Sequence, residues 1–203
     1  MARYERKDRL HQRAKDEGLR SRAAYKLEEL QKEWKLLRSG QRVFDLGCWP
    51  GGWLEVAARL VGPQGRIVGV DLAAVEPPIP AAQVVSLVGD LEDPALAGRL
   101  REALGIERAD VVLSDAAPKL TGVRERDRAN EERLLEAVER LIPELLAPGG
   151  AFVVKILAGP EAQIVDKRIR ESFAQAKTVK LDATRKGSTE RYLVARGYRG
   201  PGV

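Results

Sequence analysis

The feature that most constrains this chain is a glycine-rich turn between an expected buried strand and an expected helix. Residues 43–53 read VFDLGCWPGGW, and the apolar residues before the turn favour a strand end. Gly47, Gly51 and Gly52 lack a Cβ atom, so the backbone can approach a ligand closely. Residues 54–61 have helical spacing, which directs the free N–H groups of the first helical turn back into the glycine turn. The stretch therefore predicts a nucleotide-cofactor site.

The spacing of the glycines distinguishes this turn from a dinucleotide-binding turn. A G-x-G-x-x-G turn seats a pyrophosphate on a helix N-terminus, whereas here Gly47 and Gly51 are four apart and Asp45 precedes them. An acid in that place suits a cationic ligand end better than a phosphate. S-adenosylmethionine, which carries a sulfonium and an ammonium, is the obvious candidate. Taken alone, an ordinary Gly/Pro turn between a strand and a helix is the alternative.

Acidic residues also follow the next three expected strands. Asp71 lies twenty residues after Gly51, and an acid about 20 residues past the glycine turn is where a Rossmann-type sheet holds ribose hydroxyls. Asp90 follows the third strand, where it is placed to reach an adenine edge, and Asp115 follows the fourth. Ligands in open α/β sheets bind at the carboxyl ends of the strands. The series of acids therefore supports a cofactor site at that edge.

Helices and strands alternate along the chain, which predicts an α/β fold with a mostly parallel sheet and helices on both faces. Strands are expected at residues 43–46, 66–72, 83–88, 110–115, 151–157, 178–181 and 191–195. Helices are expected from Ser21, as an N-cap, to before Gly40, and at 54–61, 94–104, 134–145 (closed by Gly149 and Gly150) and 160–173. The charged stretch 121–133 is expected to be mostly a loop. The short link at 182–190 favours an antiparallel pair of final strands.

Length and composition indicate one domain. A chain of 203 residues with 44% hydrophobic residues can bury one good core, and we expect a basic arm at 1–20 followed by a single domain at 21–203. No apolar run is long enough to span a membrane and no apolar leader is present, so a cytoplasmic protein is expected. One cysteine and one histidine exclude a disulfide framework and a conventional structural zinc site, and no metal is expected.

Positive charge is concentrated at the N-terminal end. The net charge is +5, and residues 1–22 contribute a surplus of four, from eight basic against four acidic side chains. The basic residues are Arg3, Arg6, Lys7, Arg9, Arg13, Lys15, Arg20 and Arg22. Attraction to a polyanion such as nucleic acid would act mainly through this end. A solvated tail is the alternative.

Four side chains carry candidate chemistry. Lys26 lies beside the apolar stripe of the first helix, Asp115 follows the fourth strand, Lys155 lies inside an apolar strand, and Glu190 precedes the last strand. Lys155 is the most informative, because a lysine in a buried strand is costly unless another group holds its charge. A purely structural ion pair between Lys155 and Asp115 is the alternative.

With these residues in view, the chain resembles the FtsJ/RrmJ-type ribosomal RNA 2′-O-methyltransferases. The matching segments lie in order over residues 18–197: GLRSRAAYKLEE, DLGCWPGGW, GVD, GDLED, SDAAPKLTG, LAPGGAFVVK and STERYLVA. The resemblance implies a Rossmann-like fold dependent on S-adenosylmethionine, with a seven-stranded sheet whose last strand is antiparallel. The chain departs from the usual pattern at Cys48 and Trp49, where small residues are usual, and at Ala24, which is often aromatic.

The resemblance also implies roles for individual residues. It places a Lys-Asp-Lys-Glu catalytic tetrad on Lys26, Asp115, Lys155 and Glu190. It places cofactor binding on Gly51, Trp53, Asp71, Asp90 and Asp115. It further implies a uridine in the aminoacyl-site loop of large-subunit (23S) rRNA as the target, modified late in subunit assembly by a monomer that contacts the RNA through its basic arm and first helix.

Three functions account for these features to different extents. An RNA ribose methyltransferase explains the glycine turn, the four catalytic candidates and the basic arm. A methyltransferase acting on a small molecule or a protein explains only the turn and the acids, and a non-catalytic RNA-binding assembly factor explains only the charge. The sequence leaves open whether Lys155 accepts a proton or stays charged, because burial and Lys26 favour its neutral form while Asp115 and Glu190 favour its charged form.

Overall fold

The computed structural model describes residues 9–119, 121–156, 160–184 and 188–200, which build one seven-stranded sheet in the order β3-β2-β1-β4-β5-β7-β6. The strands are β1 Arg42–Leu46, β2 Arg66–Asp71, β3 Val84–Val88, β4 Ala109–Ser114, β5 Leu146–Ile156, β6 Phe173–Val179 and β7 Arg191–Tyr198. The pairs from β3 to β5 are parallel, and β7 is antiparallel to both β5 and β6. The predicted α/β class, the seven strands and the antiparallel last strand are confirmed.

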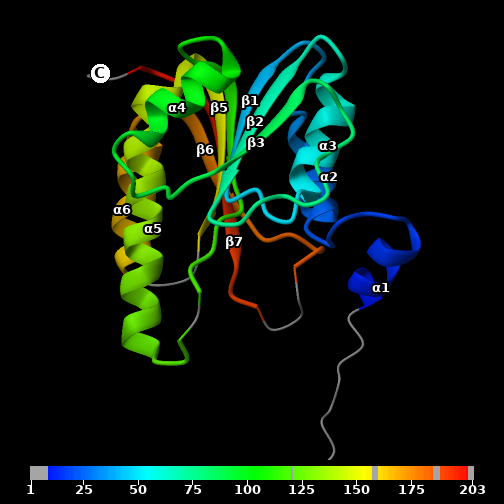
Figure 1. The fold of residues 1–203 in the computed structure, drawn as a ribbon. Coiled ribbons are helices and arrows are strands. Elements are labelled where there is room, and N and C mark those ends of the chain that lie inside the picture. Colours follow the sequence, from blue (N-terminus) through cyan, green and yellow to red (C-terminus); the bar gives the residue numbers. More distant parts are fainter. Residues whose placement is uncertain (1–8, 120, 157–159, 185–187, 201–203) are drawn as a thin grey trace, which may run out of the picture.

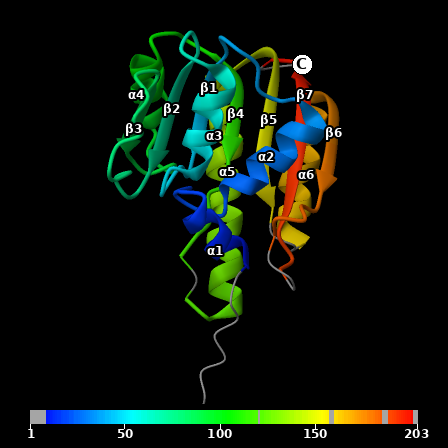
Figure 2. The same cartoon turned by 90° about the vertical axis from the view of Figure 1, so that its right-hand side faces the viewer.

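Helices cover both faces of this sheet, as predicted. They are α1 Arg9–Asp16, α2 Ala24–Trp34, α3 Gly52–Val61, α4 Leu96–Leu104, α5 Arg124–Leu145 and α6 Pro160–Glu171. Figures 1 and 2 show α4, α5 and α6 on one face, α2 and α3 on the other, and α1 beyond the lower edge. The arrowheads of β5 and β6 point downward in Figure 2, so the lower edge is where the parallel strands end.

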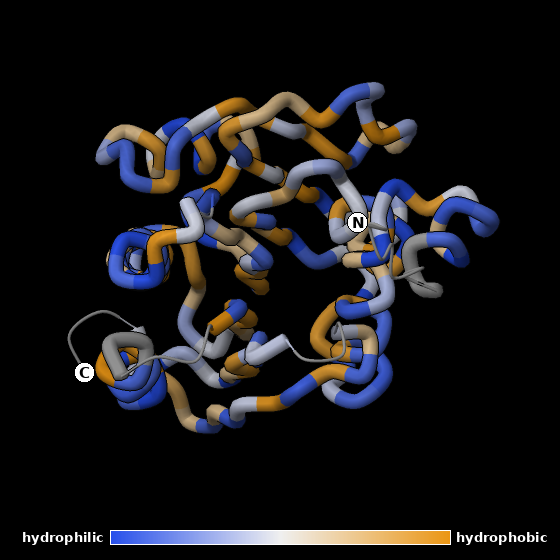
Figure 3. Tube along the Cα trace, turned by 90° about the horizontal axis from the view of Figure 1, so that it is seen from below, coloured by the Kyte–Doolittle hydropathy of each residue, from blue (hydrophilic) through white to orange (hydrophobic). Residues whose placement is uncertain are grey.

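The two faces bury separate hydrophobic cores. One core packs α4, α5 and α6 against side chains such as Phe44 and Phe152, and the other packs α2 and α3 against side chains such as Val43 and Val153. Phe44, Phe152, Val43 and Val153 are fully buried. Seen from below, apolar segments gather where the strands run and hydrophilic segments lie at the periphery (Figure 3). Successive residues of a strand face opposite sides of the sheet. Both sets are apolar in the central strands because helices cover both faces.

The first helix differs from its prediction at both ends. Helix α2 begins at Ala24 after Ala23, without a side-chain cap, so the predicted N-cap Ser21 is wrong. The Ser21 side chain instead lies buried against Gly52, at the start of α3. The helix ends at Trp34 because Lys35 takes a left-handed conformation with φ 47°, and its N–H donates to the Gln31 carbonyl. Gly40, predicted to end the helix, lies in the turn before β1.

The expected loop at 121–133 is also wrong, because α5 begins at Arg124. Asp127 explains this early start. Its carboxylate accepts the Thr121 N–H at 2.7 Å and the Gly122 N–H at 3.1 Å, which fixes the entry into the helix. Helix α5 ends at Leu145, and Gly149 and Gly150, expected to close it, belong to β5. The high charge of this segment marks a solvated helix face rather than a loop.

The described part of the basic arm, residues 9–20, contacts the domain. Tyr25 donates to Glu17 at 2.7 Å, and Arg20 forms an ion pair with Glu55 of α3 at 3.0 Å. Arg13 pairs with Glu17 and lies 5.0 Å from the centre of the Tyr25 ring. Residues 1–8 lie outside the described residues. Within the described ranges, no helix has the length and apolar character needed to cross a membrane.

Candidate functional site

The glycine turn brings the carboxyl ends of β1, β2 and β4 together. The N–H groups of Gly47 and Cys48 both donate to the Val70 carbonyl of β2, at 2.8 and 3.1 Å. Gly47 has φ 84°, and a Cβ at this position would lie 2.6 Å from Ala116 Cα in the segment after β4. Only glycine allows that approach. The turn is therefore fixed between two neighbouring strand ends.

Two of the predicted cofactor residues, Asp71 and Asp90, stand at the ends of the adjacent strands β2 and β3. Asp71 accepts the Trp49 N–H at 2.9 Å and the Ala73 N–H at 3.3 Å, which ties it to the glycine turn. Asp90 is exposed and accepts the Glu92 N–H at 2.9 Å. A carboxylate has about four acceptor sites, so both can accept further hydrogen bonds. Leu72 and Val88, 72% and 52% exposed, supply apolar surface at the same strand ends.

Two further cofactor predictions, Gly51 and Trp53, are engaged by the protein itself. Gly51 has φ 107° and is buried, and a Cβ there would lie 3.0 Å from each of Arg20, Val75 and Ile79. The Trp53 indole is 3% exposed and donates to the Ala23 carbonyl at 2.8 Å. Both residues thus have a packing role that explains their presence, and cofactor contact by either remains a prediction.

Asp45 differs from the interpretation that it meets a cationic ligand end. Its side chain is 1% exposed, and neither carboxylate oxygen has a hydrogen-bond partner among the described residues. Burial, together with the charges of Asp115 and Asp71, raises the pKa of Asp45 well above its ordinary range. The carboxyl group therefore lies inside the domain rather than open to a ligand, in surroundings that favour its neutral form.

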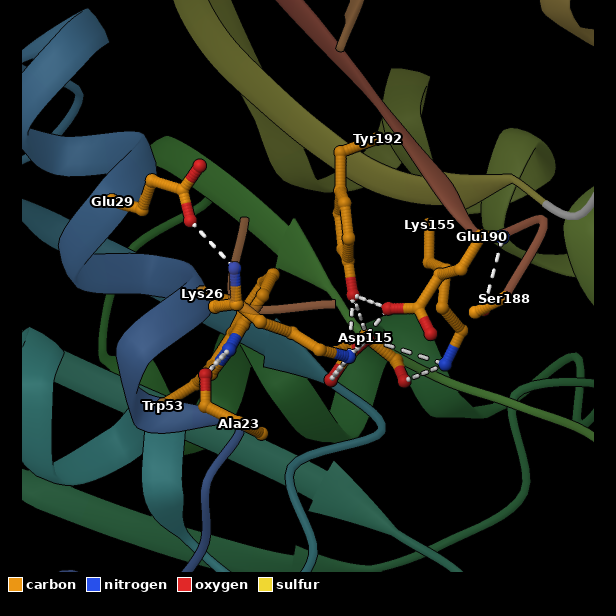
Figure 4. Close-up of polar contacts among 10 residues, drawn as sticks. Ala23, Lys26, Glu29, Trp53, Asp115, Lys155, Ser188, Glu190 and Tyr192 are labelled. Atoms are coloured by element: carbon orange, nitrogen blue, oxygen red, sulfur yellow. Dashed lines mark hydrogen bonds and ion pairs between the residues drawn. The ribbon is translucent and has the colours of Figure 1, made fainter. Parts of the chain in front are cut away.

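The four catalytic candidates meet around Asp115 (Figure 4). Lys26 Nζ lies 3.3 Å from Asp115 Oδ2 and forms a close ion pair with Glu190 Oε1. Lys155 Nζ lies 3.2 Å from Asp115 Oδ1 and donates to the Asp115 backbone carbonyl at 2.7 Å. The four residues come from α2, the segment after β4, β5 and the segment before β7. The structure therefore assembles the set that the sequence singled out.

This cluster is largely removed from water. The exposed fractions of its four side chains lie between 6% and 14%. Two lysine amino groups face two carboxyl groups, so each charged group has an opposite partner. Buried charges are tolerated when they are paired and hydrogen-bonded in this way. The set is not a single ion pair, because Asp115 holds both lysines.

Tyr192 is a fifth member that the sequence reasoning missed. Its side chain is fully buried, accepts from Lys26 Nζ at 2.8 Å, donates to Asp115 Oδ1 at 2.6 Å and also contacts Glu190. Burial, with the charges of Asp115 and Glu190, raises the pKa of Tyr192. The signal was in the sequence: Glu190 and Tyr192 are two residues apart at the start of an extended segment, so their side chains point to the same face.

Nucleophilic and metal chemistry have no support elsewhere in the described residues. Cys48 is 3% exposed, and burial, with smaller effects from Asp45 and Asp71, raises the pKa of its thiol. A thiol held protonated in this way is a poor nucleophile. Within the described ranges, no group of three His, Cys, Asp or Glu side chains could hold a metal ion.

Comparisons with known proteins found similar sequences and structures. The family model described as FtsJ-like methyltransferase matches residues 19–198. The chain is 44% identical over 196 residues to the ribosomal RNA large subunit methyltransferase E of Magnetococcus marinus, covering 93% of this chain and 90% of that protein. Among solved structures, a ribosomal RNA methyltransferase of Plasmodium falciparum superposes with a TM-score of 0.77 at 27% identity, over 89% of this chain and 99% of that one. Fibrillarin of Aeropyrum pernix, solved with bound S-adenosylmethionine, shares the fold with a TM-score of 0.63 at 21% identity, over 86% of this chain and 76% of that one.

Proposed function

Since this chain belongs to the FtsJ-like methyltransferase family, we propose that it methylates the 2′-oxygen of a uridine in the aminoacyl-site loop of large-subunit rRNA. The chain is an S-adenosylmethionine-dependent methyltransferase of a family whose relatives are ribosomal RNA methyltransferases. The uridine, the 2′-oxygen and the timing late in subunit assembly are the proposed part. So are action as a monomer and in the cytoplasm.

The observation that carries the proposal is the closed cluster of Lys26, Asp115, Lys155 and Glu190 at the carboxyl edge of the sheet. A ribose 2′-hydroxyl is a poor nucleophile, so it must be oriented and must lose its proton as the new bond forms. A methyltransferase acting on an already nucleophilic group has less need of two buried lysines. An RNA-binding assembly factor would need only surface charge, not a lysine held inside a strand.

The residues at the ends of β1, β2 and β3 fit S-adenosylmethionine, which supplies a methyl group activated by the positive charge on sulfur. The Asp71 carboxylate would accept the ribose hydroxyls, and Asp90 would reach the adenine amino group. Exposed Leu72 and Val88 offer apolar surface for the flat adenine ring. The Gly47 turn leaves room for the backbone to pass close to the ligand. Gly51, Trp53 and the Asp115 segment complete the proposed cofactor residues.

We assign the proton transfer to Lys155. In its neutral form Lys155 Nζ would take the proton from the 2′-hydroxyl while the oxygen gains the methyl group, so the lysine ends the step as an ammonium. Asp115 positions Lys155 through both its carboxylate and its carbonyl, at 3.2 and 2.7 Å. Lys26 and Glu190, held to each other, would position the ribose. Tyr192 fixes Lys26 and Asp115 relative to each other and is a positioning residue.

The test is to map ribose methylation in large-subunit rRNA from cells with and without this protein. One 2′-O-methylated uridine should disappear without the protein and return with the wild type. It should not return with Lys155→Ala, although that variant should still bind large subunits. Full methylation in the absence of the protein would refute the assignment. Restoration by Lys155→Ala would instead show that methyl transfer does not need Lys155.

The RNA partner is proposed to be held partly by the basic arm. Helix α1 lies beyond the same edge of the sheet as the catalytic cluster (Figure 1), so the arm is placed to contact RNA that enters the site. Arg13 and Arg20 already pair with Glu17 and Glu55, so the preceding residues 1–8 are better candidates for phosphate contacts. These contacts would not depend on base sequence.

Salt dependence tests the role of the arm. Replacing Arg3, Arg6 and Lys7 by Gln should weaken RNA binding and reduce the log-log salt slope by about 0.7 to 0.9 for each phosphate that is no longer neutralised. The matched control replaces Arg38, Arg42 and Arg66, which are exposed near the amino ends of β1 and β2. Removing the same charge there should leave the slope nearly unchanged. Equal salt slopes of RNA binding in the two triple variants would show that the arm is a solvated tail without phosphate contacts.

A further inference from the structure

The side chain of Glu29, on α2, holds the turn that follows β6. Its two carboxylate oxygens accept two successive backbone N–H groups, from Asp182 at 2.8 Å and from Ala183 at 3.0 Å. The Thr184 N–H donates to the Leu181 carbonyl at 3.1 Å, which closes the turn at residues 181–184. Hydrogen bonds to a charged acceptor are stronger than those between neutral groups. A single side chain of α2 therefore fixes a turn that is distant in the sequence.

The 181–184 turn lies beside Glu190. Strands β6 and β7 are antiparallel, and the last pair in their register is Val179 with Tyr192. Leu181 lies two residues after Val179, and Glu190 lies two residues before Tyr192, so the chain leaves β6 and enters β7 at the same place. Leu181 is also buried in the same hydrophobic core as Tyr192. A shift of the turn would therefore disturb the packing next to Glu190.

Helix α2 holds the chain on both sides of this connection. Lys26 and Glu29 are three residues apart, so they lie on one face of the helix (Figure 4). Glu29 binds the turn that follows β6, whereas Lys26 forms the ion pair with Glu190, which precedes β7. The outgoing and the returning chain are thus fixed to one rigid element. That element also supplies one of the four catalytic candidates.

Helix α1 packs on the same turn. Ala14 of α1, Tyr25 of α2 and Ala183 of the turn form a small apolar cluster, and all three are buried. The hydrogen bond that Tyr25 donates to Glu17 ties the end of the arm to α2 next to this cluster. The 181–184 turn thus contacts two helices, through backbone hydrogen bonds to α2 and through apolar packing with α1. Its position is determined by tertiary contacts rather than by the strands alone.

We propose that Glu29 is a positioning residue for methyl transfer, which fixes the 181–184 turn so that Glu190 stays against Lys26. The inference rests on the proposed role of Lys26 and Glu190 in positioning the ribose, and it deepens that role. Lysine and glutamate have long side chains, so an ion pair between them can form in several geometries. Fixing the chain on both sides of the pair selects one geometry before the RNA binds, as a preorganised site requires.

Removing the carboxylate tests this role. Glu29→Ala should slow single-turnover methylation of unmodified large subunits by about tenfold, because a displacement of about 1 Å can cost about 10²-fold and Lys26 and Tyr192 still limit the displacement of Glu190. Glu33→Ala removes an exposed glutamate from the same helix and should keep the wild-type rate. The cofactor dissociation constant, from calorimetry, should stay within about twofold of wild type in both variants, which also verifies folding. A wild-type rate in Glu29→Ala would overturn the proposal.

A conservative variant tests whether the two hydrogen bonds carry the effect. Glu29→Gln keeps the shape of the side chain and one acceptor oxygen, so one of the two backbone N–H groups keeps its partner. The loss of rate should therefore be smaller than in Glu29→Ala, about two- to fourfold, as expected for the loss of one hydrogen bond. A rate as low as that of Glu29→Ala would contradict positioning through these hydrogen bonds.

The decisive measurement is a double-mutant cycle with Glu190→Gln. If Glu29 acts through Glu190, Glu29→Ala should slow the Glu190→Gln protein by less than about twofold, because residues that act together have non-additive effects. A further slowing of about tenfold in that protein would show that the two residues act independently. It would overturn the positioning role and leave the proposed function intact. Wild-type turnover by Glu190→Gln alone would instead refute the proposed role of Glu190, and this inference would fail with it.

Discussion

The carboxyl edge of the sheet has two halves that hold their charged side chains differently. At the ends of β4, β5 and β7, Lys26, Asp115, Lys155 and Glu190 neutralise one another and are nearly buried. At the ends of β2 and β3, the hydrogen bonds of the Asp71 and Asp90 carboxylates within the described part of the chain go to nearby backbone N–H groups, next to exposed apolar side chains. The first half is organised without any ligand, whereas the second presents acceptors and apolar surface that a ligand would complete.

The difference predicts that variants in the two halves change different quantities. Changes at Lys26, Lys155 or Glu190 in the catalytic half should alter the rate of the chemical step and leave cofactor affinity nearly unchanged, whereas Asp115 is proposed to serve both halves. Changes in the cofactor half should alter affinity and leave the rate at saturating cofactor nearly unchanged. A variant in either half that changed both quantities equally would show that the halves are one coupled site.

Lys155→Ala should have the largest effect. Removal of a general base typically costs about 10² to 10⁴ in rate, so single-turnover methylation of large subunits should fall by that range. Cofactor affinity should stay within about twofold, because Lys155 bonds to Asp115 rather than to the residues at the ends of β2 and β3. The rate is measured by quenched transfer of labelled methyl groups, with calorimetry as the control. A rate within threefold of wild type would show that Lys155 takes no part in the chemical step.

Asp71→Ala should have the next largest effect, on binding. Losing a charged acceptor costs about 1.5 to 3 kcal/mol, so the dissociation constant of S-adenosylmethionine should rise by more than tenfold. Asp90→Ala should act in the same direction more weakly. Because Asp71 also accepts the Trp49 N–H, Asp71→Asn is the matched variant that retains an acceptor. An unchanged dissociation constant in Asp71→Ala would show that the cofactor does not bind at the end of β2.

Tyr192→Phe should have an intermediate effect in the catalytic half. The phenolic hydroxyl is the only part removed, and its removal leaves buried groups on Lys26 and Asp115 without this partner. Such changes cost about 1 to 3 kcal/mol, so the free energy of unfolding in urea should fall by that amount. Poorer positioning should slow methylation about tenfold. Since Tyr192 acts through other residues, the pH dependence of the rate should keep its shape, and a shifted profile would instead indicate that the phenol takes part in proton transfer.

Most of the fold and the members of the catalytic set could be predicted from the sequence. Alternating periodicities and turn residues are local signals, and they identified six of the seven strands closely. The strand expected at 178–181 lies instead at Phe173–Val179, directly after α6 ends at Glu171. The resemblance brought Lys26 and Glu190 together although 164 residues separate them. Tyr192 was missed because a tyrosine in an apolar strand is usually a core residue. Its positioning role depends on the hydrogen-bond partners of its hydroxyl group, which the strand pattern does not show. The Asp127 contacts at the start of α5 are local hydrogen bonds that hydrophobic periodicity does not report. The enclosure of Asp45 depends on tertiary packing, which local patterns do not report either.

Asp45, at the border between the halves, should affect the pH dependence of stability rather than the rate or the cofactor affinity. Below its unfolded pKa of about 3.9 the carboxyl group is protonated in both states and contributes nothing. Above that pH the unfolded chain ionises while the folded one does not, because its pKa is raised. The wild type should therefore lose stability relative to Asp45→Asn by at most about 1.4 kcal/mol per pH unit above about pH 4, until the folded pKa is passed. Urea unfolding of both proteins at pH 4, 6 and 8 checks this, and a pH-independent difference would mean that Asp45 titrates normally.

The central claim is that Lys155 removes the proton from the acceptor hydroxyl, and the pH dependence of single-turnover methylation tests it most directly. In the wild type the rate should rise with pH until the lysine is neutral and then level off. Lys155→Arg keeps a positive charge that is not lost in proteins, so its rate should be about 10² to 10⁴ lower and should not rise in that way, with cofactor and RNA affinities preserved. Near-normal, pH-independent turnover by Lys155→Arg would contradict the claim and leave Lys155 as a fixed charge that orients the oxygen.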